Sequence, residues 1–315
     1  MAPNLNSKFL IDGMVPVIPT PFQENEEIAW ESLPPMIDFA RAARASAVCL
    51  PAYASEFYKL GESERLRLIE AAVQAAAGKI PVVAQVNAPS LSQAISMART
   101  AAEMGASAIA TAVPRLFAVP EDDLYDYFDR LLSQVRLPVI IQDFNPGGAT
   151  VSVAFVERLH RSHPHFQYLK LEEPMMAAKA IAIREATAGE VKVLEGWGGM
   201  YLLDLAPTDI AGVVPGLGAV DLLDRAFRAA KAGQRQQACR TFEAVLPQIV
   251  YSLQNLELYH HAEKRLLQAR GVLNTVVVRR PRMSLSAHEA AHIDFINRRI
   301  LELLEEFGMP HNPAQ

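Results

Sequence analysis

The chain has 315 residues, of which 50% are hydrophobic and 21% are charged, and its net charge is −5. This length allows one large α/β barrel with an appendage, or two modest domains. The acidic balance predicts no nucleic-acid partner, and no uninterrupted apolar stretch approaches the length of a membrane span. Residues 1–10 lack the basic-then-apolar pattern of a signal peptide, and Cys49 and Cys239 lie outside any CxxC or Cys/His cluster. We therefore expect a cytoplasmic protein with buried, reduced thiols.

Short apolar runs alternate along the chain with amphipathic segments. The predicted strands are Met14–Pro19, Ala47–Pro51, Pro81–Val86, Ala108–Val113, Pro138–Phe144, Phe166–Glu172, Val191–Gly196 and Gly212–Gly216. Their hydrophobicity is continuous and does not alternate, which is typical of parallel strands that are buried on both faces.

Amphipathic segments between these strands predict helices. They are Leu33–Arg44, Glu62–Ala77, Ser90–Met104, Glu121–Val135, Val151–Arg161 and Pro174–Ala188. Gly78, Gly105 and Gly189 follow three of these segments, at the position where a glycine commonly ends a helix. Eight strand–helix units predict an α/β fold, a TIM (β/α)8 barrel, which we assign to residues 1–232 as the catalytic domain.

After Gly233 the strand pattern stops. The segments Gln234–Tyr251, Gln254–Ala269 and Ala287–Phe307 are predicted helices, so we expect residues 233–315 to form a C-terminal helical domain. A basic cluster, residues 279–282, precedes the last helix. On an acidic chain this cluster favours a solvated loop or a subunit contact over a nucleic-acid site.

Lys170 lies within the sixth predicted strand, in an apolar run. Burying an ammonium group is costly unless it is paired or deprotonated, and a neutral amine is a nucleophile toward carbonyl carbons. Lys170 is therefore a candidate for Schiff-base formation. The alternative is a lysine at a strand end whose amine extends to water, which is the commoner situation for an arbitrary strand lysine.

Glu172 follows Lys170 by two residues. Residues i and i+2 of a strand share a face, so both side chains point into the barrel if either does. Glu172 would then lie one layer nearer the C-terminal ends of the strands, where TIM barrels carry their active sites. It is a candidate acid/base there, and the alternative is a purely structural ion pair. Glu173 is expected to face the helices.

Other strand ends carry further candidates. Tyr53 follows the second strand and is either a phenol of the site or a packed aromatic residue. Gln142 and Asp143 stand near the end of the fifth strand. Gly196 follows the seventh strand and would let a ligand approach the backbone closely, although a tight loop alone also explains a glycine here.

The order and spacing of several motifs resemble the dihydrodipicolinate synthase/N-acetylneuraminate lyase family of the class I aldolase superfamily. These motifs are Val15–Phe22, Ser55-Glu56 followed by Leu60 and Glu64-Arg65, Leu137–Ile141, Lys170 and Gly212–Gly216. The resemblance covers nearly the whole chain. It implies Schiff-base lyase chemistry on pyruvate-like 2-oxo acids, without a cofactor or a metal, in a homo-oligomer that is a tetramer or a dimer.

The resemblance also implies roles for individual residues. The expected catalytic residues are Lys170, Glu172 and Gln142, and the expected substrate-binding residues are Tyr53, Ala54, Ser55, Asp143, Gly196 and Val214. Lys170 matches the Schiff-base lysine of the family. The backbone amides of Ala54 and Ser55 are placed near the substrate carboxylate, while Gln142, Asp143 and Glu172 would handle distal hydroxyls and protons.

This sequence departs from the family pattern at four places. The paired threonines after the second strand are Tyr53-Ala54 here, and the Tyr-Asn of the fifth strand is Gln142-Asp143, so the usual phenol is missing. Pro146–Gly148 replaces an arginine-bearing loop, and Arg115-Leu116 replaces an aromatic pair that reaches across a subunit interface. The branch with 2-keto-3-deoxy-pentonate (arabinonate) dehydratase is a closer resemblance, because it shares the Ser-Glu, Gln-Asp and Lys-x-Glu motifs.

The sequence therefore predicts a lyase that acts on 2-oxo acids, a 2-keto-3-deoxy sugar acid dehydratase or aldolase rather than a true dihydrodipicolinate synthase. The same lysine serves both reactions, so it does not distinguish them. Alternatives are synthase-like condensation of pyruvate with an aldehyde, a non-catalytic sugar-acid binding or regulatory protein, and a metal-dependent barrel lyase. The last would need clustered ligands at strand ends, whereas His160, His163 and His165 lie before the sixth strand.

Overall fold

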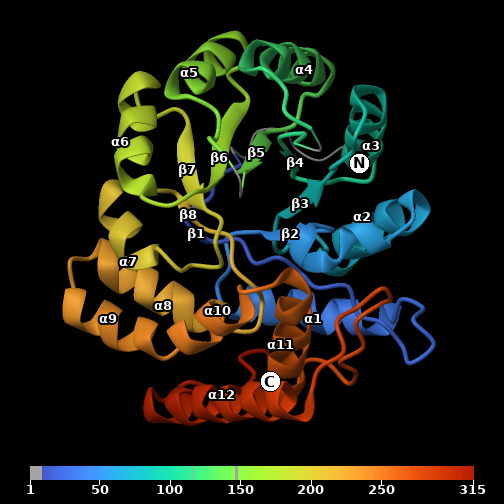
Figure 1. Cartoon of the computed structure of the whole chain (residues 1–315), viewed down its shortest axis with the longest axis vertical. Coiled ribbons are helices and arrows are strands. Elements are labelled where there is room, and N and C mark those ends of the chain that lie inside the picture. The colour runs from blue at the N-terminus through green and yellow to red at the C-terminus, as the bar shows by residue number, and fades with distance from the viewer. Residues whose placement is uncertain (1–8, 116, 146–147) are drawn as a thin grey trace.

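The computed structural model describes residues 9–115, 117–145 and 148–315 (Figure 1). Eight strands form one parallel sheet in the order β1-β8-β7-β6-β5-β4-β3-β2. They are β1 Gly13–Met14, β2 Val48–Leu50, β3 Val82–Gln85, β4 Ala108–Ala112, β5 Val139–Phe144, β6 Phe166–Glu172, β7 Lys192–Glu195 and β8 Gly212–Val213. The strand that carries Lys170 has its predicted bounds. Residues 1–8, Leu116, Pro146 and Gly147, to which the sequence also assigned features, lie outside the described residues.

Backbone hydrogen bonds close this sheet into a barrel. β1 pairs with β8 through Gly13 and Gly212. The segment after β1 pairs with β2, where the Cys49 amide donates to the Pro16 carbonyl and the Ile18 amide donates to the Cys49 carbonyl, both at 3.0 Å. The predicted TIM barrel is confirmed.

The first and last strands are shorter than predicted. Pro16 and Pro19 follow β1, and Pro215 follows β8. Proline has no amide hydrogen and cannot donate to a strand ladder, so beyond Pro16 and Pro215 the ladder continues only as the isolated bridges of Val17 with Cys49 and Gly216.

Helices alternate with the strands and cover the barrel (Figure 1). They are α1 Leu33–Ala42, α2 Glu62–Ala76, α3 Leu91–Glu103, α4 Glu121–Gln134, α5 Val153–Ser162, α6 Met176–Ala186, α7 Leu202–Leu205 and α8 Val220–Lys231. Four helices follow, α9 Arg235–Glu243, α10 Leu246–Ser252, α11 Leu256–Ala269 and α12 Ala287–Glu306. A short 3-10 turn, η2, spans Tyr53–Ser55.

The single helix predicted over Gln234–Tyr251 is wrong, because α9 and α10 are separate helices. Pro247 explains the break. A proline inside a helix removes one hydrogen bond and its ring clashes with the carbonyl four residues earlier, which belongs to Glu243, the last residue of α9. Pro247 instead occupies the first turn of α10, where proline is tolerated.

The barrel interior changes from apolar to polar toward the carboxyl ends of the strands. One inner cluster contains Val83, Ala108, Ile140, Tyr168 and Leu194. Two residues further along three of these strands stand Gln85, Gln142 and Lys170, all of them buried. Because residues two apart share a face, these polar side chains form the next layer inside the barrel.

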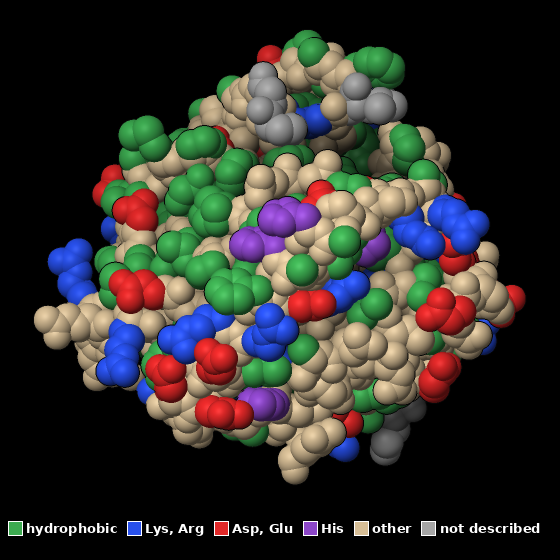
Figure 2. Space-filling model, turned by 60° about the horizontal axis from the view of Figure 1, so that its bottom comes forward, with side chains coloured by type: hydrophobic (Ala, Val, Ile, Leu, Met, Phe, Trp, Pro, Cys, Tyr) green, Lys and Arg blue, Asp and Glu red, His purple; other side chains and the backbone are tan. Residues whose placement is uncertain are grey.

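The C-terminal helices pack against the barrel, with α9 beside α8 and α11 against η2. The boundary between two domains at residue 232 stays a prediction. Figure 2 brings these helices toward the viewer and shows acidic and basic side chains interspersed over that face. Within the described ranges, no helix combines the length and the apolar composition needed to cross a membrane.

The seam between β1 and β8 gives a first prediction. A Cβ atom added at Gly212 would overlap the carbonyl oxygen of Gly13 in the neighbouring strand. We expect Gly212→Ala to lower the free energy of unfolding by about 3 kcal/mol, at the upper end of overpacking costs. The control is Gly61→Ala, whose new Cβ would meet only Glu64, at 3.8 Å. Equal urea midpoints for the two variants would show that the seam can widen.

Candidate active site

A cavity of about 490 Å³ opens at the carboxyl ends of the strands. Its lining combines strand ends, the loops after them and the C-terminal helices. The lining residues are Val17, Ala52, Tyr53, Ala54, Gln142, Phe144, Lys170, Glu172, Gly196, Trp197, Gly198, Met200, Val214, Pro215, Gly216, Val250, Leu253, Gln254, Asn255, Leu256 and Tyr259. The location fits the general rule that TIM barrels place their sites at this end.

Lys170 and Glu172 both point into the cavity from β6, as the period of the strand predicted. Both residues are only 8% exposed, and the Lys170 Nζ lies 3.0 Å from the Glu172 Oε1. Glu173 faces the other way and pairs with Lys179 of α6 at 3.3 Å. The structure thus brings a buried amine and a buried carboxylate together at the base of the cavity.

Gln142 completes this pair. Its Nε2 donates to Glu172 Oε1 at 2.6 Å, while its own Oε1 accepts from Gln85 Nε2 at 2.8 Å. Gln85 Nε2 also donates to Asn87 Oδ1 at 2.9 Å. The chain of amides fixes which end of Gln142 faces the carboxylate, because a carboxylate can only accept. Sequence reasoning missed Gln85, although a lone glutamine in an apolar strand is a signal of the same kind as Lys170.

Gly196 lies directly against the Glu172 side chain. A Cβ atom at position 196 would overlap the Cγ of Glu172. The glycine after β7 therefore makes room for the Glu172 side chain, in addition to lining the cavity. Val214, just beyond β8, also lines the cavity and is 5% exposed.

The turn η2 presents Tyr53 and Ala54 to the cavity, whereas Ser55 turns inward. The Ser55 hydroxyl donates to the Ile18 carbonyl at 2.6 Å and accepts from the Ala52 amide at 3.0 Å. The Ser55 amide already donates to the Ala52 carbonyl at 2.9 Å. Ser55 therefore shapes the turn and does not line the cavity. Burial and the negative charge of Glu172 raise the pKa of Tyr53.

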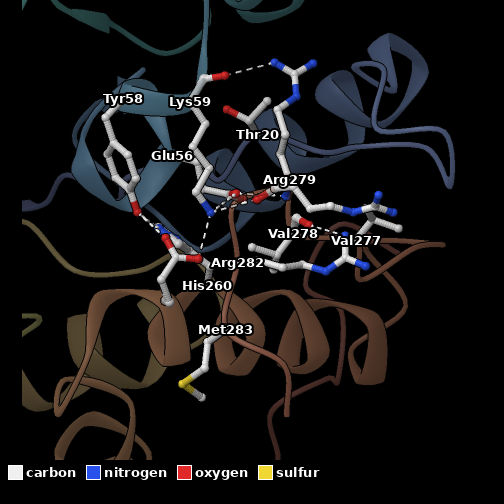
Figure 3. A network of polar contacts seen from close by, with 12 residues as sticks. Thr20, Glu56, Tyr58, Lys59, His260, Val277, Val278, Arg279, Arg282 and Met283 are labelled. Atoms are coloured by element: carbon white, nitrogen blue, oxygen red, sulfur yellow. Dashed lines mark hydrogen bonds and ion pairs between the residues drawn. The ribbon is translucent and has the colours of Figure 1, made fainter.

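Glu56 directly follows this turn, and its carboxylate lies in a network of polar contacts (Figure 3). It adopts a left-handed conformation with φ of 60°, and its carboxylate is buried. Lys264 of α11 contacts one oxygen at 2.6 Å, and Lys59 contacts the other at 3.1 Å. The Arg279 amide donates to that second oxygen at 3.1 Å. Burial lowers the pKa of Lys264 to about 8, against the opposing pull of Glu56.

The basic cluster at 279–282 is not simply a solvated loop. The Arg279 side chain pairs with Glu64 at 2.8 Å and lies over the Phe22 ring, with 4.5 Å between its guanidinium carbon and the ring centroid. Arg280 and Arg282 both pair with Glu26. Carboxylates of the barrel, Glu64 and Glu26, thus hold this segment in place. Its predicted role as a subunit contact stays a prediction.

Asp143 does not join the other expected site residues. Neighbouring residues of a strand face opposite sides, so Gln142 points inward and Asp143 outward. Asp143 accepts from Arg115 at 2.6 Å and from the Val151 amide at 2.5 Å, and it is fully buried. Burial raises the pKa of Asp143, although Arg115 opposes the shift. Its contacts hold the loops after β4 and β5 together, outside the cavity.

Glu195, the last residue of β7, is a buried carboxyl group that sequence reasoning passed over. It accepts from the Gly199 amide at 2.7 Å and from the Tyr201 amide at 3.5 Å. Burial raises its pKa to about 7, and Glu172 adds to the shift. Glu195 therefore holds the loop that brings Trp197 to the cavity.

The histidines before β6 have contacts of their own. His160 Nδ1 lies 3.0 Å from the Phe166 carbonyl oxygen, and His163 Nε2 lies 2.9 Å from Asp129. These contacts place them at the start of β6, away from Glu172 at its end. Over residues 9–115, 117–145 and 148–315, no three His, Cys, Asp or Glu side chains gather as metal ligands would.

Comparison with known proteins identifies the family of this chain. Residues 10–296 match the dihydrodipicolinate synthetase family. The chain belongs to this family. The match confirms the resemblance expected from the sequence and, with it, an enzyme of the lyase class.

Two curated relatives show how the similarity is distributed. The L-2-keto-3-deoxyarabonate dehydratase of Azospirillum brasilense is 26% identical over 295 residues, 91% of this chain and 94% of that protein. The 4-hydroxy-tetrahydrodipicolinate synthase of Azoarcus sp. (strain BH72) is 32% identical, but over only 45% of this chain and 48% of its own length.

Solved structures share the fold. The dihydrodipicolinate synthase from Rhodopseudomonas palustris superposes with a TM-score of 0.86 at 22% identity, covering 94% of this chain and all of that one. The prophage protein YagE from E. coli K12, solved in complex with pyruvate, gives 0.84 at 20% identity over 92% of this chain and 98% of its own. At these identities the similarity shows a shared fold, the barrel with its appended helices.

The buried carboxyl of Glu195 predicts a pH dependence of stability. Its pKa is about 7 in the folded protein and 4.5 when unperturbed, so the folded state binds the proton more tightly between these values. Stability should therefore fall as pH rises from about 4.5 to 7. In Glu195→Gln this fall should shrink by about 2–3 kcal/mol, measured by urea unfolding across that range. Glu190→Gln, at an exposed position, is the control. If the free energy of unfolding depends equally on pH in both variants, Glu195 is not the group responsible.

Proposed function

We propose that this protein is a Schiff-base-forming lyase that acts on 2-oxo acids. One observation carries the proposal: the buried amine of Lys170 lies at the base of the cavity, 3.0 Å from the Glu172 carboxylate. A carboxylate at this distance can take the ammonium proton, and the neutral amine is the form that attacks a carbonyl carbon. Gln142, Tyr53 and Ala54 stand around this pair.

The reaction begins with attack of Lys170 on the C2 carbonyl carbon, followed by loss of water to give a protonated imine. This cation withdraws electrons from C3, so a base can remove a C3 proton and leave an enamine. The enamine then expels a β-hydroxyl from C4 as water, which is dehydration. Alternatively, starting from the protonated imine, a base removes the proton of the C4 hydroxyl, the C3–C4 bond breaks and an aldehyde leaves. The enamine that remains then takes a proton at C3 and becomes an imine again. Hydrolysis of the imine returns the free lysine in both cases.

Glu172 is the base in this proposal, with Gln142 holding it in place. The Gln142 amide donates to the same Glu172 oxygen that faces Lys170, so the carboxylate is oriented before a substrate binds. Tyr53 is the neighbouring phenol and carries protons to and from the C4 hydroxyl. The backbone of Ala54 receives the substrate carboxylate. Asp143 and Ser55 act on the site through the loops that they hold, as positioning residues.

The proposed substrate class is that of 2-keto-3-deoxy sugar acids, which the enzyme dehydrates or cleaves. The full-length similarity to the Azospirillum brasilense dehydratase supports this class. Gln142 stands where the family has a phenol, which disfavours the synthase reaction of pyruvate with aspartate semialdehyde. That condensation remains the alternative activity, and a binding protein without turnover is the alternative without chemistry. A cytoplasmic location and a homo-oligomeric state belong to the same proposal.

Trapping tests the lysine. Borohydride reduction in the presence of pyruvate should add mass to the peptide that contains Lys170, because borohydride converts an imine into a stable amine. Lys170→Arg should lose the adduct, whereas Lys179→Arg should keep it, since Lys179 pairs with Glu173 on the outer side of β6. An adduct on another lysine, or no adduct with any 2-oxo acid, would sink the proposal.

A second experiment tests Glu172 without knowledge of the natural substrate. Imine formation with pyruvate should make its methyl protons exchange with deuterated water, because the enamine forms by loss of a C3 proton. We expect Glu172→Gln to slow this exchange about 100-fold while borohydride trapping at Lys170 persists. Glu173→Gln makes the same change on the opposite face of β6 and should leave the exchange near the wild-type rate. Normal exchange in Glu172→Gln would make Glu172 a structural partner only.

A further inference from the structure

Trp197 lines the cavity with an unused hydrogen-bond donor. The pairing of β6 with β7 places Leu194 beside Lys170, so Trp197 stands three residues further toward the mouth. Its indole Nε1 is buried, and no group among the described residues accepts a hydrogen bond from it. An indole N–H can only donate, so the partner that suits this position is an acceptor such as an oxygen.

A ligand oxygen would remove the cost of this unpaired donor, because a buried N–H without an acceptor is unfavourable. Trp197 as a whole is only partly buried, and it borders the cavity. A small rotation of the indole ring therefore brings its N–H to a ligand without any movement of the backbone.

Two polar side chains beyond α10 also line the cavity, and both are exposed. Gln254 Nε2 donates to the Tyr251 carbonyl at 3.0 Å, and Asn255 Oδ1 accepts from the Glu257 amide at 2.8 Å. These bonds engage one polar atom of each side chain. Gln254 Oε1 remains as an acceptor and Asn255 Nδ2 as a donor, so the outer part of the cavity offers both kinds of group to a hydroxyl.

The charges of the cavity lining exclude a second carboxylate on the ligand. Among the described residues, the only cationic side chain of the lining is Lys170 at its base, and Glu172 adds a negative charge beside it. A carboxylate at the outer end would lose hydration without gaining a Lys, Arg or His partner. A hydroxyl is neutral and can accept from the Trp197 N–H, so it fits this part of the cavity better.

We infer that Trp197 is a specificity-determining residue whose indole N–H donates to the outermost hydroxyl of a substrate with a single carboxylate. The inference rests on the proposed function and narrows its class to 2-keto-3-deoxy sugar acids with a neutral, hydroxylated outer end. The substrate carboxylate lies at Ala54, C2 at Lys170 and the outermost hydroxyl at Trp197. Sugar diacids are poor ligands for this site.

Three 2-hydroxy acids of equal length test this subsite separately from the chemistry, because a 2-hydroxy acid forms no imine. The outer end is a hydroxymethyl group in 2,4,5-trihydroxypentanoate, a methyl group in 2,4-dihydroxypentanoate and a carboxylate in 2,4-dihydroxypentanedioate. We expect calorimetry to give the trihydroxy acid a Kd at least about fivefold below the other two. Equal Kd values, tighter binding of either other acid, or no measurable binding of the trihydroxy acid would overturn the inference.

Variants assign the preference to Trp197. Trp197→Phe removes the N–H and keeps an aromatic ring, so the Kd values of the trihydroxy acid and of 2,4-dihydroxypentanoate should agree within about twofold. The control is Trp30→Phe, the same change at the only other tryptophan. Trp30 lies outside the cavity lining, under the guanidinium group of Arg67, and its variant should keep the wild-type preference. An unchanged preference in Trp197→Phe would also overturn the inference.

Borohydride trapping with pyruvate is run on the same samples, because pyruvate has no outer end and tests only the base of the cavity. Loss of trapping with the ligand preference intact would reject the proposed lyase chemistry and leave the Trp197 subsite standing. Trapping at Lys170 without a preference among the three acids would reject the subsite and leave the lyase chemistry standing.

Discussion

A charged amine inside a parallel barrel requires a compensating carboxylate, and much of the site follows from that requirement. Lys170 has Glu172 at 3.0 Å. Glu172 in turn requires the amide of Gln142 and the space that Gly196 leaves beside it. Gln142 requires Gln85 to fix its orientation. Residues of three strands, β3, β5 and β6, and the residue after β7 are therefore adapted to one ammonium group, and the polar layer is confined to the depth at which that group lies.

Much of the site is held from the side of the C-terminal helices. Lys264 neutralises Glu56 behind the turn that faces Lys170. The loop between α10 and α11 and the first residue of α11 complete the cavity wall. Charge therefore fixes the inner turn while hydrophobic packing forms the outer wall, and both contributions come from the same pair of helices. Separating the helices from the barrel would disturb the polar and the apolar parts of the site together.

The sequence predicted the barrel and the inward pair on β6 because both depend on short-range periodicity. Asp143 was expected in the site because the family resemblance places both residues of the Gln-Asp motif there, yet adjacent residues of a strand face opposite sides. The inward position of the Ser55 hydroxyl depends on Ile18, in another segment, and no local pattern reveals it. Leu253 could not be predicted as a cavity residue at all, because its position depends on how α10 packs. Periodicity thus predicts which side chains of one strand share a face, whereas tertiary packing decides which residues of other segments reach the cavity.

The pairing of Glu56 with Lys264 joins residues 208 positions apart in the chain. During synthesis, Glu56 leaves the ribosome long before its partner exists. At roughly 5–20 residues per second, the carboxylate waits about 10–40 s for Lys264. In that interval Glu56 has the nearby ammonium group of Lys59 but lacks the contact that Lys264 makes with its other oxygen, so its burial is incompletely compensated. The barrel strands can assemble in chain order, but the site becomes complete only when α11 has emerged. We therefore expect ribosome-bound chains that lack α11 to pair their barrel strands without completing the site.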